Sequence, residues 1–307
     1  KGYHPRPMDI RELRCALEEG SSSEAWTTVL ARFFESHHLS YGHGTDNASD
    51  EAYWLIRAQQ GWLPEAWSQP PCRDLINPVV ELAERRVLER KPLAYLLGEA
   101  WFAGLCFEVD ERVLIPRSPL AELVERGFGP WCSLEPGDHV LDIGTGSGCL
   151  AVGIAHYCPG VMVDATDVSG EALLVARSNV EQYGLESRVR LIESDLFSAV
   201  QGRYRLILSN PPYVPHARLE ELALEYSHEP VLALEGGSSG LDIVDRILTS
   251  AADHLLADGV LIVEIGEVQE AFMALHPELP VTWLEFERGG EGVFMLTRAE
   301  LTGYLSG

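Results

Sequence analysis

The chain has 307 residues, of which 46% are hydrophobic and 23% are charged, a composition typical of a soluble globular protein of one or two domains. No apolar run is long enough to span a bilayer and no signal peptide is evident, so we expect no membrane partner and a cytoplasmic location. The formal net charge of −24 would repel a phosphate backbone and attract a basic partner, so direct DNA binding is not expected.

The cysteines and histidines do not indicate a metal site. No Cys-x-x-Cys pair occurs, and we expect six free, mostly buried thiols in a reducing compartment: Cys15, Cys72, Cys106, Cys132, Cys149 and Cys158. His37, His38 and His43 cluster in the sequence, but no carboxylate or cysteine falls at ligand spacing beside them. We therefore predict no bound metal.

Residues 1–95 are expected to form a small helical domain. Residues 8–39 have the apolar spacing of two helices, and the capping-box pair Ser21 and Glu24 precedes the second. A longer helix is predicted over about 77–90. The helical region should end near Lys91.

Residues 96–119 change character. Apolar residues alternate on either side of a glycine, which indicates a β-hairpin that connects two domains. Pro116 and Pro119 end this segment.

Residues 120–307 repeat a strand and helix pattern. Helices are expected at 169–183 and 240–256, and residues 282–297 read as two strands around a Gly-Gly turn. The other strands are predicted at His139–Ile143, Met162–Asp167, Val189–Glu193, Arg205–Ser209 and Gly259–Ile265. This alternation predicts an α/β fold with a doubly wound, mostly parallel sheet and an antiparallel pair at one edge.

A glycine-rich turn joins the first of these strands to a helix in "VLDIGTGSGCLAV", residues 140–152. The spacing of Gly144, Gly146 and Gly148 departs from the Gly-x-Gly-x-x-Gly dinucleotide fingerprint. Asp142, directly before the glycines, would repel a pyrophosphate. A carboxylate there suits a cation, such as the ammonium group of an amino acid.

Two further carboxylates follow the next two strands. Asp167 can accept hydrogen bonds from ribose hydroxyls, and Asp195 can accept one from an adenine amino group. The alternative role for both is to cap a following helix. A cation, a ribose and an adenine together describe S-adenosylmethionine.

The fourth strand ends in "LSNPPYVP", residues 208–215. The Asn210 side-chain oxygen and the Pro211 carbonyl can accept both hydrogens of a planar NH₂ group, and Pro211 and Pro212 fix the backbone. Tyr213 can stack on the substrate group. The alternative is an Asn-Pro turn with no catalytic role. The glycine loop, which should lie beside this segment, favours a clamp for a planar amide or amine.

"NPPY" after "DIGTGSG" resembles the methyltransferases that modify a glutamine side-chain nitrogen or the exocyclic amine of adenine. "AYLLGEAWFAGLCFEVDERVLIPRSP", "EYSHEPVLALEGGSSGLD" and "TWLEFERGGEGVFMLT" look like the bacterial protein-glutamine N5-methyltransferases. "YGHGTDNASDEA" and "PRSP" resemble the branch that modifies large-subunit ribosomal protein L-three. The resemblance covers roughly residues 39–307. It departs at Gly144, where that branch often has cysteine.

This resemblance implies a seven-stranded class I, Rossmann-like methyltransferase domain at 120–307, with the hairpin and the helical domain before it. The helical domain would help to recognise a basic protein substrate, and Arg117 would help to close the site. The cofactor would be S-adenosylmethionine, with S-adenosylhomocysteine as the product and no metal. Its binding residues would be Asp142, Gly144, Thr145, Gly146, Ser147, Gly148, Asp167, Asp195, Leu196 and Asn210. The substrate glutamine would be bound by Asn210, Pro211, Pro212 and Tyr213.

Three alternatives stay open. The sister branch methylates peptide chain release factors, but it usually reads Pro-Arg-Pro-Glu/Asp-Thr-Glu where this chain has "PRSP". A nucleic-acid adenine N6-methyltransferase would need a basic groove, and the only lysines are Lys1 and Lys91. A non-catalytic module for cofactor binding or ribosome assembly would be expected to have a damaged clamp.

Overall fold

The computed structural model describes residues 6–62, 67 and 71–307. The described chain divides into two compact units. The first runs to Glu99 and also includes Ala223–His228, a segment from far along the chain. The second comprises Ala100–Leu222 and Glu229–Gly307.

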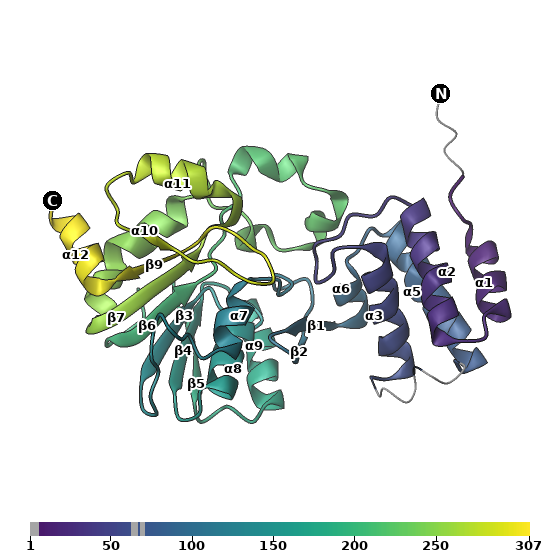
Figure 1. Cartoon of the computed structure of the whole chain (residues 1–307), viewed down its shortest axis with the longest axis horizontal. Helices are drawn as coiled ribbons and strands as arrows, with labels where there is room; N and C mark the ends of the chain where they lie inside the picture. The colour runs from purple at the N-terminus through teal and green to yellow at the C-terminus, as the bar shows by residue number, and fades with distance from the viewer. Residues whose placement is uncertain (1–5, 63–66, 68–70) are drawn as a thin grey trace. The chain divides into compact units, whose positions relative to one another are not determined.

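The first unit is helical, as Figure 1 shows. Ser22 caps α2 by accepting a hydrogen bond from the Ala25 N–H, so the predicted capping pair at Ser21 and Glu24 is wrong by one residue. The extended backbone of Ser22 lets its hydroxyl reach the first turn of the helix. The elements of this unit are α1 (Ile10–Glu19), α2 (Ser23–Ser36), α3 (Ala48–Gln60), η1 (Arg73–Leu75), α5 (Ile76–Leu88), α6 (Leu93–Leu97) and η3 (Leu224–His228).

A buried ionic cluster fixes η3 within the first unit. The Glu225 carboxylate is fully buried and accepts a hydrogen bond from the Ser40 N–H at 2.9 Å. It pairs with Arg86 at 3.3 Å and with Arg90 at 2.9 Å, and Arg86 also pairs with Glu51 at 2.5 Å. Because buried charges are stable only when they are paired, this cluster anchors a segment about 140 residues distant in sequence from Arg86.

The second unit contains a seven-stranded sheet (Figure 1). The first five strands in spatial order are parallel, and β9 runs antiparallel to both of its neighbours. The order is β5 (Val189–Glu193), β4 (Met162–Asp167), β3 (His139–Ile143), β6 (Tyr204–Ser209), β7 (Leu255–Glu264), β9 (Val293–Thr297) and β8 (Thr282–Trp283). The predicted doubly wound fold with an antiparallel edge is confirmed.

Two predicted boundaries are wrong. The helix expected over 240–256 ends earlier, because α10 covers Asp242–Ala251, η5 covers Ala252–His254, and Leu255 already pairs with Tyr204 of β6. The edge strands are not joined by a two-residue turn, since β8 has only two residues and residues 284–292 separate it from β9. Pairing with neighbouring strands, which is a tertiary interaction, sets both limits.

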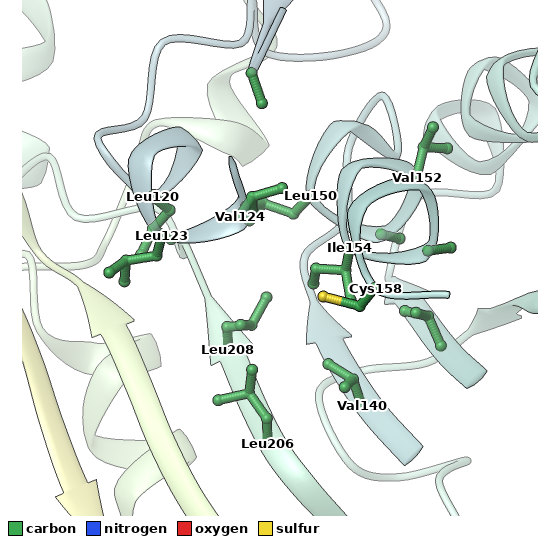
Figure 2. Packing of buried hydrophobic residues seen from close by; sticks show 14 of the residues in the cluster. Leu120, Leu123, Val124, Val140, Leu150, Val152, Ile154, Cys158, Leu206 and Leu208 are labelled. Carbon is green, nitrogen blue, oxygen red and sulfur yellow. The ribbon is translucent and has the colours of Figure 1, made fainter. Parts of the chain in front are cut away.

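Alternate residues of the central strands face two hydrophobic cores. One core contains Val140, Leu206 and Leu208 together with side chains of α7 (Leu120–Glu125), α8 (Cys149–Tyr157) and α9 (Gly170–Gln182). Figure 2 shows the strand residues with the side chains of α7 and α8. The other core contains α10, α11 (Gln269–Leu275) and α12 (Arg298–Ser306). Helices on both faces leave the strand ends as the place for a ligand.

The predicted hairpin connector is present as a two-stranded sheet of β1 (Glu99–Phe102) and β2 (Leu105–Glu108). Phe102 and Phe107 from this hairpin join the same core as α7 and α8. The remaining short elements are η2 (His216–Glu221), η4 (Val231–Ala233) and η6 (Gly266–Val268).

The cysteines differ from expectation. All six are free, but only Cys132 and Cys158 are buried, while Cys15 and Cys72 are exposed. The prediction that most are buried is wrong, because Cys15 is an exposed residue of α1, Cys72 lies in an exposed position just before η1, and Cys106 and Cys149 are only partly buried. Within the described residues, no helix is both long and apolar enough to cross a membrane.

Candidate active site

The carboxyl ends of β3, β4 and β6 lie side by side. Ile143, which ends β3, pairs with Thr166 of β4 and with Ser209 of β6. The glycine loop, Asp167 and Asn210 directly follow these three positions. The sheet therefore brings together segments separated by more than 60 residues, as the strand order predicted.

A pocket opens at this edge of the sheet. Eight of the predicted site residues line it: Gly144, Gly146, Asp167, Asp195, Leu196, Asn210, Pro211 and Pro212. The other predicted residues, which are Asp142, Thr145, Ser147, Gly148, Tyr213 and Arg117, do not line it. Sequence reasoning missed two other segments of the lining, residues 112–114 and 230–235. Both lie inside the motifs that carry the family resemblance, and that was the only signal for them.

The glycine loop turns tightly over the end of β4. The N–H groups of Gly144 and Thr145 both donate to the Thr166 carbonyl at 2.8 Å. A Cβ on Gly148, the residue directly before α8, would lie 3.2 Å from Ala176 of α9. This glycine therefore lets α8 and α9 pack closely. A Cβ on Gly144 or Gly146 would meet no atom within 4 Å. Those two glycines therefore serve the turn and leave space on the pocket side.

Asp142 lies beneath the loop and is fully buried. Its Oδ2 accepts a hydrogen bond from Thr145 Oγ1 at 2.6 Å, whereas its Oδ1 has no partner within the described residues. The pKa of Asp142 is raised to about 7, mainly by burial and also by the nearby charge of Asp167, against the opposing hydrogen bond from Thr145. The Ala151 N–H also lowers this pKa, although it makes no hydrogen bond of good geometry with Oδ1. A buried carboxylate oxygen with no donor fits a cofactor that carries an ammonium group.

Asp167 joins the glycine loop to the start of α9. Its Oδ2 accepts a hydrogen bond from the Gly146 N–H and its Oδ1 accepts one from the Ser169 N–H, both at 2.9 Å. Ser169, not Asp167, caps α9 by accepting a hydrogen bond from the Ala172 N–H. The capping alternative is therefore wrong for Asp167. Burial raises the pKa of Asp167, and each oxygen keeps a lone pair for a hydroxyl donor.

Asp195 lines the pocket from the turn after β5. No helix of the described chain begins there, so capping does not explain it either. Its carboxylate pairs with Arg246 of α10 at 2.8 Å, and both side chains are about half exposed. Leu196 beside it has a φ of +50°. Arg246 is a residue that sequence reasoning missed, because its partner lies 51 positions away.

The "NPPY" segment leaves β6 at the pocket. Asn210, Pro211 and Pro212 line the cavity, and the Asn210 side chain has no hydrogen-bond partner in the part of the chain described. Tyr213 lies differently from the prediction. Its ring packs against Gly266, where an added Cβ would lie only 2.8 Å from the ring. Its hydroxyl donates to Glu264 at 3.4 Å. The Asn210 amide is therefore available to a ligand in the pocket, whereas the Tyr213 ring packs against the protein and does not line the pocket.

Arg117 does not line the pocket but joins two segments that do. Its guanidinium makes two hydrogen bonds to the buried Glu229 carboxylate, at 2.5 and 2.8 Å. Glu229 also accepts a hydrogen bond from the Ile115 N–H at 3.2 Å. This pair holds residues 112–114 and 230–235 in place on one side of the pocket.

The described residues contain no group of three His, Cys, Asp or Glu side chains that could hold a metal ion. The pocket instead is lined by the carboxylates of Asp167 and Asp195 and by Asn210, and the buried Asp142 carboxylate lies just before the glycine loop. The fold and the site define the class of S-adenosylmethionine-dependent methyltransferases with a Rossmann-like sheet.

Comparison with known proteins agrees with this class. Residues 132–226 match the family model of the methyltransferase small domain. The ribosomal protein uL3 glutamine methyltransferase of Neisseria meningitidis serogroup A is 48% identical over 281 residues, which cover 90% of this chain and 92% of the relative. The proteins of the same name from Neisseria gonorrhoeae and Bordetella pertussis are 46% and 45% identical, over 90% and 86% of this chain and 93% and 90% of theirs. The chain belongs to the ribosomal protein uL3 glutamine methyltransferase family.

Proposed function

We propose that this enzyme transfers a methyl group from S-adenosylmethionine to the side-chain amide nitrogen of a glutamine in ribosomal protein uL3. The observation that carries the proposal is the unpaired amide of Asn210, which lies at the pocket between the glycine loop and two prolines. The names of relatives that are up to 48% identical over 90% of the chain support the choice of substrate.

The chain's carboxylates would bind the cofactor at three points. Asp142 would accept a hydrogen bond from the ammonium group, directly or through water, and this contact would relieve a buried oxygen that has no donor. Asp167 would accept from the ribose hydroxyls while the Gly146 N–H fixes its orientation. Asp195 would accept from the adenine amino group while Arg246 fixes its position. When bound, the cofactor supplies a methyl group attached to a positively charged sulfur.

The clamp would hold the substrate amide in line with that methyl group. Asn210 Oδ1 and the Pro211 carbonyl would accept the two amide hydrogens, and these two contacts would fix the nitrogen and localise its lone pair. Pro212 adds no competing N–H and restricts the backbone. The contribution of these residues is positioning and electrostatic stabilisation, without a strong base or a metal. The proton lost on methylation leaves with solvent.

Charge also supports a basic protein substrate. The net charge of −24 favours association with a protein that itself binds RNA phosphates. We also place the enzyme in the cytoplasm, where ribosomal proteins are assembled. The first, helical unit remains our candidate for recognition of the rest of the substrate.

A methyl-transfer assay tests the proposal. Radiolabelled S-adenosylmethionine is offered with isolated uL3, with a peptide chain release factor or with adenine-containing DNA, and the product is mapped by mass spectrometry. Label on one glutamine of uL3, retained in the presence of EDTA, is the expected result. Label on the release factor would keep the chemistry and change the substrate, and label on DNA would refute the charge argument. No label on any of the three would favour a non-catalytic role in ribosome assembly.

A further inference from the structure

Glu264 is a buried carboxylic acid next to the clamp. It is the last residue of β7, and the pairing of Ser209 with Val263 places it at the level of Asn210 on the neighbouring strand. It is 5% exposed and does not line the pocket. Glu264 can therefore affect the substrate only through other residues.

Two hydroxyl groups meet at this carboxylate. Ser118 Oγ makes a short hydrogen bond to Oε2, and the Tyr213 hydroxyl donates to Oε1 at 3.4 Å. Ser118 Oγ also accepts a hydrogen bond from the Leu120 N–H at 3.1 Å, so its single proton is available for Glu264. One buried group thus joins the end of the connector, the last residue of the clamp motif and the end of β7.

Tyr213 is confined at its ring and at its backbone. Gly266 has a φ of +50°, and a Cβ there would lie 2.8 Å from the ring. A Cβ on Gly240 would lie 2.3 Å from the Tyr213 carbonyl oxygen, and one on Gly236 would lie 2.7 Å from the Pro212 carbonyl oxygen. Because the surrounding backbone is packed so closely, a shift of Tyr213 must move the clamp itself.

We infer that Glu264 is a positioning residue, which holds the Tyr213 hydroxyl and thereby aligns Asn210 and Pro211 on the substrate amide. This inference rests on the proposed function and goes beyond it, because Glu264 belongs to none of the segments that touch substrate or cofactor. Its role is to restrict the clamp to one orientation, since an error of about 1 Å in placement can cost about 100-fold in rate.

The charge state of Glu264 makes the role measurable. The ionised carboxylate can accept from both hydroxyls, whereas the protonated form gives up one acceptor position. Burial raises the pKa of Glu264 to about 7, against the hydrogen bonds from Ser118 and Tyr213 and the nearby positive charge of Arg117. Arg117 itself is paired with Glu229. The clamp should therefore be best aligned above neutral pH.

The test compares Glu264→Gln, Tyr213→Phe and the double variant in the uL3 methylation assay. Each single variant should lower kcat about tenfold or more with little change in the Kd for S-adenosylmethionine, and the double variant should be no slower than the slower single variant. Glu122→Gln is the matched control, because Glu122 is also 5% exposed and accepts hydrogen bonds from the N–H groups of Glu287 and Arg288. It should lower stability and leave kcat unchanged.

The pH profile separates positioning from a purely structural role. Wild-type kcat should fall as the pH drops through about 7, and Glu264→Gln should lack this limb. A kcat unchanged in Glu264→Gln, or losses that multiply in the double variant, would overturn the inference. If Glu264→Gln fails to fold, Tyr213→Phe alone tests the inference. An unchanged kcat in Tyr213→Phe would show that the hydroxyl contact with Glu264 does not align the clamp. A wild-type enzyme that does not methylate glutamine would instead refute the proposed function, on which the inference depends.

Discussion

The buried carboxylate beneath the glycine loop allows a quantitative prediction about stability. A pKa raised from 3.8 to about 7 means that ionised Asp142 costs the folded protein about 4 kcal/mol relative to the unfolded chain. The folded state binds the proton more tightly than the unfolded state, so stability is lost as the pH rises from about 4 to about 7. Between pH 5 and pH 8 this single group should lower the free energy of unfolding by about 3 kcal/mol.

Asp142→Asn removes that pH-dependent loss. The variant keeps the shape of the side chain but leaves a buried NH₂ without a partner, which costs about 1–3 kcal/mol at every pH. The free energy of unfolding of the variant, relative to that of the wild type, should therefore increase by about 3 kcal/mol from pH 5 to pH 8. At pH 8 and without cofactor the variant should be at least as stable as wild type, although it binds S-adenosylmethionine more weakly.

Urea denaturation at the two pH values measures this difference directly. The other buried acids are the same in both proteins and cancel in the comparison. Asp253→Asn is the control, because Asp253 is exposed and its substitution should change stability by less than about 0.5 kcal/mol at either pH. A difference between Asp142→Asn and wild type that stays constant from pH 5 to pH 8 would refute the reasoning.

Four other predictions concern the glycine loop, the ionic cluster of the first unit and two residues of the pocket. Gly148→Ala should lose about 2–4 kcal/mol of unfolding free energy, because its φ of +80° disfavours a side chain and the new methyl group would press on α9, whereas Gly144→Ala, with open space, should lose only about 1–2 kcal/mol. Equal losses in urea denaturation would contradict this. Glu225→Ala should cost about 3–5 kcal/mol, since it removes the buried carboxylate that pairs with both Arg86 and Arg90, and Glu51 remains as a partner for Arg86 alone. A loss below about 1 kcal/mol would show that η3 is not anchored there. Asn210→Ala should cut kcat heavily at nearly unchanged cofactor affinity, and Asp167→Ala should do the reverse. Calorimetry and the methylation assay decide both, and a matching loss of affinity and activity in Asn210→Ala would rule out its role on the nucleophile.

Much of the sheet could be predicted from local pattern. The bounds of β3, β4 and β5 agree with the expected strands at both ends. These are buried parallel strands with turn residues at their limits, so the apolar run and the strand coincide. The boundary between α10 and β7 could not be found in this way. Alanine and leucine near position 251–256 suit a helix as well as a strand, and only the pairing with Tyr204 decides where the strand begins.

The glycine loop, the acidic residues Asp167 and Asp195 and the Asn-Pro-Pro segment could be proposed from the sequence, because each depends on neighbours in the chain. A glycine allows a positive φ wherever it stands, and Asn-Pro-Pro fixes its own backbone. Parallel strands then bring these short motifs to one edge. The strand order that follows from the alternation of strands and helices was enough to place them together.

Contacts between distant residues carry no such local signal. Arg117 and Glu229 are 112 positions apart, and their pairing makes residues 112–114 and 230–235 part of the pocket wall. Tyr213 was expected in the pocket, yet its ring is held by Gly266 and its hydroxyl by Glu264. The sequence by itself was enough to predict which residues would bind a cofactor and a planar amide, because that chemistry belongs to the residue types and their spacing. Only the tertiary structure decided which side chains enter the pocket and which support it from behind, because burial and partner choice depend on the packing of the whole unit.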